Sequence, residues 1–152
     1  MRLEGGCGCG EVRYRLTTSP MFVHCCHCLN CQRQTGTAFV LNMLIEASRV
    51  ELVAGTPTAV DVSREHGLHR IFRCPRCQVA VWSEYSGRSE VLFVRAGTLD
   101  DPAAVSPDVH IYTRSKLPWV TLPASVPAFE EYYDTAKLWP PESLARRKAL
   151  FG

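Results

Sequence analysis

The sequence lacks the features that mark several large classes of protein. It has no apolar run approaching the roughly 18 residues that a membrane-spanning helix needs, and Met1–Gly6 has no apolar run resembling a signal peptide. Its formal net charge is only +2, too weak to argue for a nucleic-acid partner, which normally meets a concentrated basic face. These absences predict a chain that works in the cytoplasm, with neither a membrane nor a nucleic acid as its partner.

Internal repeats, low-complexity stretches and linkers are also missing. The chain has 152 residues, of which 46% are hydrophobic, so it is long enough to bury one real core. We therefore expect a single domain over residues 1–152.

Cysteine, in contrast, is abundant and clustered. Seven of the eight cysteines stand in close-spaced groups, which are Cys7-x-Cys9, Cys26-x-Cys28-x-x-Cys31 and Cys74-x-x-Cys77. In a reducing compartment such clusters indicate metal or redox chemistry more often than disulfides, and a bridge across a single intervening residue is strained. Zinc takes four nitrogen or sulfur ligands, so the spacing predicts zinc binding.

The two outer pairs predict one closed structural site. Cys7 and Cys9 precede an alternating stretch, and Cys74 and Cys77 lie between two further apolar stretches, as in the knuckle of a zinc ribbon. A zinc held by all four thiolates would join segments distant in sequence and contribute folding energy through the metal. The alternative is a set of buried free thiols.

The central triplet predicts a different kind of site. Three thiolates around zinc leave one position open, where an incoming thiol could bind and lose its proton. Because thiolate is the nucleophile, Cys26, Cys28 and Cys31 could activate a small thiol for attack on a carbonyl carbon. The alternative is that Cys25, His24 or His27 completes a second closed site. The five histidines form no known ligand pattern, so we expect each to be a surface or packing residue.

The remaining pattern predicts a mainly β domain. Between Glu11 and Thr17, apolar and polar residues alternate with the period of a half-buried strand, and residues 37–45 read as a buried strand. Further short runs, bounded mostly by Gly, Pro or Ser, are expected to form strands at residues 50–53, 58–62, 69–73, 79–85, 90–96 and 110–113. The stretch around the triplet reads as polar and turn-prone.

The C-terminal third is punctuated by proline, which argues against long helices before residue 140. We expect an ordered segment anchored by Trp119, Phe129 and Tyr132. Good helix formers follow Pro140-Pro141, in a stretch from Glu142 to Phe151 that is short for a helix alone.

These motifs resemble a known family, the glutathione-dependent formaldehyde-activating enzymes (GFA), over about residues 3–130, which leaves 131–152 as a C-terminal tail. The residues that carry the resemblance are Gly6-Cys7-x-Cys9-Gly10, Val12-Arg13-Tyr14, Cys26-His27-Cys28-x-x-Cys31-Gln32-Arg33, Cys74-x-x-Cys77, Gly97-Thr98-Leu99-Asp100-Asp101-Pro102, His110-Ile111-Tyr112, Ser115-Lys116-x-Pro118-Trp119 and Pro127-x-Phe129. One departure is Gln78, where the family commonly has glycine, so the turn after the second pair is expected to differ.

The resemblance implies a mainly β zinc-containing fold of the β-tent (Mss4-like) kind. It implies a structural zinc held by Cys7, Cys9, Cys74 and Cys77, and a more labile catalytic zinc held by Cys26, Cys28 and Cys31. The implied activity is that of a carbon–sulfur lyase, joining glutathione and formaldehyde into S-hydroxymethylglutathione. Arg33, beside the triplet, is our first candidate to receive the carboxylates of such a thiol.

Two other functions compete with this one. The chain could be a non-catalytic binding module, stabilised by zinc, that engages a protein through its β surface. It could also be a nucleic-acid-binding zinc ribbon, but no basic stripe accompanies the cysteines. A thiol and an aldehyde therefore remain the expected partners.

Overall fold

The structure is a computed structural model that describes residues 3–63 and 67–152. Strands account for 37% of it and helices for 23%, so the expectation of a mainly β chain is confirmed. The chain divides into two compact units, unit 1 within Met1–Pro20 and Met43–Ala104, and unit 2 within Met21–Asn42 and Val105–Gly152. His66 lies outside the described residues. No helix among the described residues is long and apolar enough to cross a membrane.

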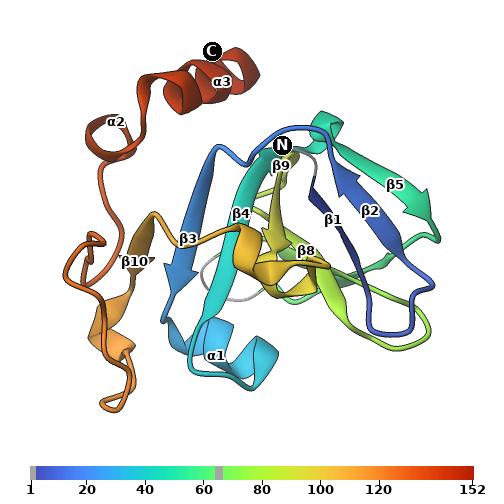
Figure 1. Ribbon diagram of the computed structural model, residues 1–152, viewed down its shortest axis with the longest axis horizontal. Coiled ribbons are helices and arrows are strands. Elements are labelled where there is room, and N and C mark those ends of the chain that lie inside the picture. Colours follow the sequence, from blue (N-terminus) through green and yellow to red (C-terminus); the bar gives the residue numbers. More distant parts are fainter. Residues whose placement is uncertain (1–2, 64–66) are drawn as a thin grey trace. The chain divides into compact units, whose positions relative to one another are not determined.

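A three-stranded antiparallel sheet forms the first part of unit 1. Its strands are β1 (Leu3–Gly6), β2 (Arg13–Leu16) and β5 (Val50–Ala54), in the order β1-β2-β5, and Figure 1 shows them side by side. The alternation seen in the sequence is confirmed, because Tyr14 and Leu16 are fully buried while Arg13 and Arg15, which alternate with them, are half-buried. Gly5 is required at the centre of β1, since a Cβ there would lie 2.5 Å from the Thr98 carbonyl oxygen.

Four antiparallel strands form the second part of unit 1, in the order β9-β8-β7-β6. They are β6 (Thr58–Asp61), β7 (His69–Arg73), β8 (Ala80–Tyr85) and β9 (Arg88–Arg95). Ser86 and Gly87 connect β8 to β9 with φ of 57° and 69°, the left-handed conformation that a tight hairpin turn needs. A further strand, β4 (Val40–Glu46), begins in unit 2 and ends in unit 1.

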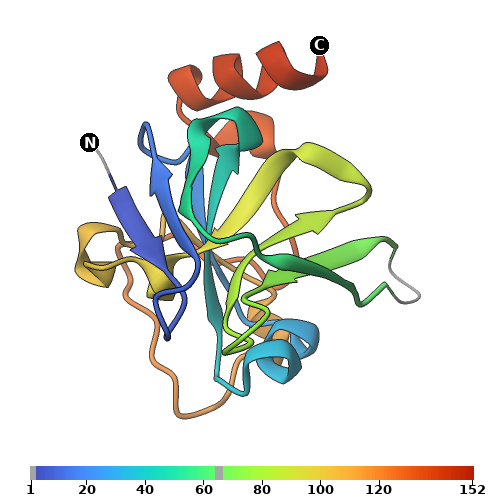
Figure 2. The same ribbon diagram turned by 90° about the vertical axis from the view of Figure 1, so that its right-hand side faces the viewer.

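Unit 2 is built on two parallel strands, β3 (Phe22–Cys26) and β10 (Val109–Ile111), whose register places His110 opposite Cys25 and Ile111 opposite Cys26. Three helices accompany them, which are α1 (Leu29–Thr35), α2 (Thr135–Leu138) and α3 (Pro141–Phe151). The chain from β10 to α2 is irregular apart from the short 3-10 helix η4 (Thr113–Ser115), and α3 is one continuous helix (Figure 2). Ser143 anchors α3, because its hydroxyl donates to the Met21 carbonyl at 2.6 Å.

Two expectations for unit 2 are wrong. The stretch around the triplet is not merely turn-prone, because it supplies the buried strand β3 and the helix α1. A cysteine sulfur caps the start of this helix in place of the usual Ser, Thr, Asp or Asn, while Gly36, with φ of 65°, ends it in the usual way. Trp119 and Tyr132 are not buried anchors, since 73% of Trp119 and 47% of Tyr132 are exposed. The buried anchors of the C-terminal segment are instead Tyr133 and Trp139, joined by a hydrogen bond from the indole nitrogen at 2.6 Å.

Candidate metal centres

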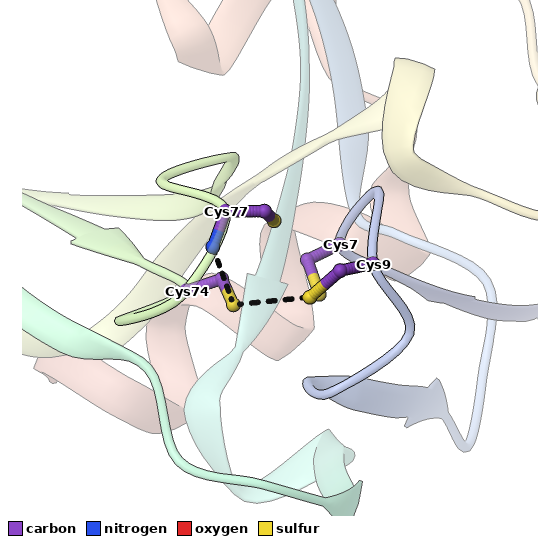
Figure 3. A group of neighbouring side chains, drawn as sticks. All are labelled: Cys7, Cys9, Cys74 and Cys77. Atoms are coloured by element: carbon purple, nitrogen blue, oxygen red, sulfur yellow. Dashed lines mark hydrogen bonds between the residues drawn. The ribbon is translucent and has the colours of Figure 1, made fainter.

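Four cysteine thiols meet in unit 1, as Figure 3 shows. Cys7 and Cys9 follow strand β1, and Cys74 and Cys77 lie in the turn between β7 and β8. The sulfur atoms of Cys7 and Cys9 are 3.6 Å apart, and those of Cys9 and Cys74 are 3.8 Å apart. Four sulfurs placed tetrahedrally at the zinc–sulfur distance of about 2.3 Å would be separated by roughly 3.8 Å. The four thiols therefore fit a zinc ion.

Backbone N–H groups point at two of these sulfurs. Val12 donates to Cys7 Sγ at 3.3 Å, and Cys77 donates to Cys74 Sγ at 3.5 Å. The bond from Val12 helps to lower the pKa of Cys7, which favours the thiolate, the form that binds metal. The turn itself closes through Gln78, whose N–H donates to the Cys74 carbonyl at 3.0 Å. Gln78 has φ of 65°, the left-handed conformation that favours glycine.

The four thiols ionise unequally when no cation lies among them. The pKa of Cys77 is lowered to about 6, and the largest cause is the hydrogen bond that its sulfur accepts from the Val79 N–H. The Glu11 N–H acts in the same direction on Cys9, but desolvation and the three neighbouring thiols outweigh it and raise the pKa of Cys9 to about 11. Four thiolates this close repel one another, so a divalent cation between them is what would let all four lose their protons.

The triplet meets in unit 2, with all three sulfur atoms within 4.8 Å of one another. Cys26 ends β3, Cys28 is the N-cap of α1, and Cys31 is buried in the first turn of that helix. Cys28 Sγ accepts the Cys31 N–H at 3.2 Å. The pKa of Cys28 is lowered to about 2, most strongly by a hydrogen bond from the Cys26 thiol, next by one from the Cys31 thiol, and then by backbone N–H groups. The hydrogen bonds of Cys26 with Cys28 and Cys31 in turn raise the pKa of Cys26.

The loop that carries the triplet is held at its central residue. The His27 N–H donates to the Ile111 carbonyl at 3.0 Å, which continues the pairing of β3 with β10. The His27 carbonyl accepts from Gln32 Nε2 at 2.9 Å and from Ser115 Oγ at 3.0 Å. Three hydrogen bonds thus fix the residue between Cys26 and Cys28, so the two flanking thiols are presented in a set geometry.

No further cysteine or histidine among the described residues joins the triplet. His24 is occupied elsewhere, with its Nε2 atom 2.5 Å from the Tyr133 hydroxyl. Cys25 and His27 group instead with His110. The described residues therefore offer a metal ion three protein ligands at the triplet.

The group of Cys25, His27 and His110 is a site that sequence reasoning missed. Its three ligand atoms lie within 4.8 Å of one another and all three residues are buried. Cys25-x-His27 is visible in the sequence, but His110 lies 83 residues after His27 and comes near only through the parallel pairing of β10 with β3. The pKa of His27 is lowered to about 4, chiefly by burial and to a smaller extent by the charges of His110 and Lys116. Burial also lowers the pKa of His110. Both rings are neutral near pH 7, the form that ligates metal.

The two arginines considered from the sequence are both exposed. Arg76 lies within the turn of the four-cysteine site. Arg33 lies on α1, two residues after Cys31, and therefore about 200° further around the helix. Cys31 is buried and Arg33 is not, so the two side chains do not share a face.

Three comparisons relate the chain to known proteins. The model of the family described as "Glutathione-dependent formaldehyde-activating enzyme" matches residues 2–115. A curated protein of Halomonas elongata, named "Putative glutathione-dependent formaldehyde-activating enzyme", is 28% identical over 129 residues, covering 80% of this chain and 82% of that protein. The crystal structure of a Rhodobacter sphaeroides protein matches with a TM-score of 0.52 and 17% identity, covering 83% of this chain and 99% of that one. The expected β-tent fold class is confirmed.

Proposed function

The chain belongs to the glutathione-dependent formaldehyde-activating enzyme family, and on that premise we propose that it is a zinc-dependent carbon–sulfur lyase. It would add a small thiol such as glutathione to formaldehyde or a related aldehyde, and would catalyse the reverse reaction equally. The observation that supports this function most directly is the triplet of Cys26, Cys28 and Cys31, which converges without a fourth protein ligand among the described residues. The four-cysteine site would be structural.

A zinc ion at the triplet would supply a position where a substrate thiol binds as thiolate, the nucleophilic form. The chain's own residues hold that position in place. Cys28 and Cys31 are fixed by the first turn of α1, and Cys26 by its place opposite Ile111. Ligands fixed in this way would hold the bound sulfur in one place, which lowers the entropic cost of its attack on an aldehyde carbonyl.

The charge of a zinc-loaded triplet indicates what a thiol substrate would need around it. Three thiolates around one divalent cation leave a net charge of −1, so binding a fourth thiolate requires positive groups to receive the rest of the substrate. Glutathione is a tripeptide whose carboxylates lie several bonds from its sulfur. Arg33 remains our candidate for them, because an exposed guanidinium on the far side of α1 would meet a carboxylate away from the bound sulfur. We place the reaction in the cytoplasm, where glutathione is abundant and thiols stay reduced.

Cobalt substitution tests the proposal directly, because thiolate-to-cobalt charge-transfer absorption reports sulfur ligation. Glutathione should strengthen this absorption by about one further thiolate in the wild-type protein. The increment should disappear in Cys28→Ser and persist in Cys25→Ser, the matched variant of a neighbouring cysteine outside the triplet. Arg33→Ala should weaken glutathione binding while leaving the response to a small uncharged thiol unchanged.

A wild-type spectrum that does not respond to glutathione or to any other small thiol would contradict the enzymatic proposal. The remaining function would then be the non-catalytic binding module, in which zinc serves the fold alone.

A further inference from the structure

A second cluster of metal-binding atoms lies in the interior of unit 2, apart from the triplet. His27 Nε2 is 3.0 Å from His110 Nδ1 and 3.6 Å from the Cys25 sulfur. The rings of the two histidines are tilted by 35°, with centroids 5.2 Å apart. All three residues are buried, His27 completely, so their polar atoms face one another rather than solvent.

The spacing of these atoms is close to that of a metal's ligands. With zinc–nitrogen distances of about 2.0–2.1 Å and a zinc–sulfur distance of about 2.3 Å, tetrahedral ligands are separated by roughly 3.4 Å between nitrogens and 3.6 Å between nitrogen and sulfur. The observed sulfur–nitrogen separation equals this value, and the nitrogen–nitrogen separation is a few tenths of an ångström shorter. Small ring rotations would accommodate the ion.

Hydrogen bonding alone satisfies this cluster poorly. Two neutral rings can share only one proton between His27 Nε2 and His110 Nδ1, and the thiol of Cys25 then finds its nearest nitrogen already engaged. The outer ring nitrogens, His27 Nδ1 and His110 Nε2, have no hydrogen-bond partner within residues 3–63 and 67–152. A buried unpartnered polar atom costs about as much as a typical hydrogen bond contributes, or more. One shared proton therefore does not offset the burial of both rings.

We infer that Cys25 Sγ, His27 Nε2 and His110 Nδ1 form a third metal site, for a borderline transition-metal ion such as zinc. The ion replaces the proton between the two rings, which moves to the outer nitrogen of its own ring, so that both imidazoles stay neutral. The proton of the Cys25 thiol leaves to solvent as the ion binds. Its ligand set of two nitrogens and one sulfur differs from the all-sulfur sets of the other two sites. Imidazole and thiolate are the ligands that zinc takes most readily.

The charge of this site complements that of the triplet. A divalent ion with one thiolate and two neutral imidazoles carries +1, and the same ion with three thiolates carries −1. The two ligand sets alternate along the chain, since Cys25 is followed by Cys26, and His27 by Cys28. Opposite charges attract, so the charge of one site does not oppose an ion in the other.

Metal analysis tests this inference on the intact chain, purified without chelator and saturated with zinc. The wild-type protein should bind one zinc more than Cys25→Ser and one more than His110→Gln. The control is His69→Gln, which alters a buried histidine of unit 1 that belongs to none of the three metal-binding groups found among the described residues and should keep the wild-type count. The difference between variants does not depend on whether the triplet itself is loaded, so failure here is separable from failure of the proposed enzyme function.

A measurement on the wild type alone covers the case in which a variant does not fold. Protein loaded with ¹¹³Cd should show a resonance from a site with one sulfur and two nitrogens, separate from those of the sulfur-only sites. Nitrogen-15 spectra should show His27 protonated at Nδ1 and His110 protonated at Nε2, with both inner nitrogens coupled to cadmium. Equal zinc counts in all four proteins, or a cadmium spectrum with sulfur-only resonances, would overturn the third site.

Discussion

Replacing Cys74 by serine should unfold the protein, and replacing Cys28 by serine should not. The two substitutions make the same chemical change at two clusters that differ in what they connect. Cys74 is fully buried, and its cluster joins residues 65 positions apart in the sequence. Cys28 is half-buried, and its cluster spans the six residues from Cys26 to Cys31.

The magnitudes follow from these connections. A structural zinc contributes on the order of 10 kcal/mol to the folding of small zinc domains, while whole domains are stable by only about 5–15 kcal/mol. Cys74→Ser forfeits much of that contribution and also weakens the hydrogen bond from the Cys77 N–H. Cys28 is the N-cap of α1, and serine is itself a favoured N-cap, so Cys28→Ser should cost less than about 1 kcal/mol.

The assay is thermal unfolding followed by circular dichroism, with zinc content measured on the same samples. Cys28→Ser should melt within about 4 °C of the wild type, given the usual 2–4 °C per kcal/mol for a chain of this size. Cys74→Ser should be aggregated, or show no cooperative transition, and should lack the zinc of the four-cysteine site. If the two variants melt at the same temperature, the division into a structural and a catalytic site is wrong.

Three further predictions concern metal lability, close packing and acid stability. A chelator should remove metal from the triplet first, because three protein ligands hold it against four, and mass spectrometry should then place small-thiol adducts within residues 24–33 rather than at the outer pairs. Gly5→Ala should lower the free energy of unfolding by about 1–3 kcal/mol, because its Cβ would overlap backbone, while Gly97→Ala, with no atom within 4 Å of the added Cβ, should change it little in urea denaturation. The Arg13 guanidinium lowers the pKa of Asp100, so this pair stabilises the fold above about pH 4 and its contribution is lost as the pH falls further; Asp100→Asn should show a shallower loss of stability in an acid titration, and an unchanged slope would contradict this.

Some strands could be predicted from the sequence because they depend only on the local pattern of polar and apolar residues. The alternation around Tyr14 and the run at His69–Arg73 predicted strands β2 and β7, since side chains on a strand alternate between two environments wherever the strand lies. β3 and α1 were not readable. All five residues of β3 are buried, so it shows no alternation, and the cap of α1 is a cysteine sulfur that no propensity scale would choose.

The sequence by itself determined the three short-spaced groups of cysteines, because residues one to three positions apart stay close in space however the chain folds. It also predicted that the outer pairs meet, and the structure brings all four thiols together. Only the tertiary structure brought His110 to Cys25 and His27, because that approach depends on which strand pairs with β3 and in which register. Strand pairing is decided by contacts between distant segments, and parallel strands are not joined by a short turn that would fix their register locally.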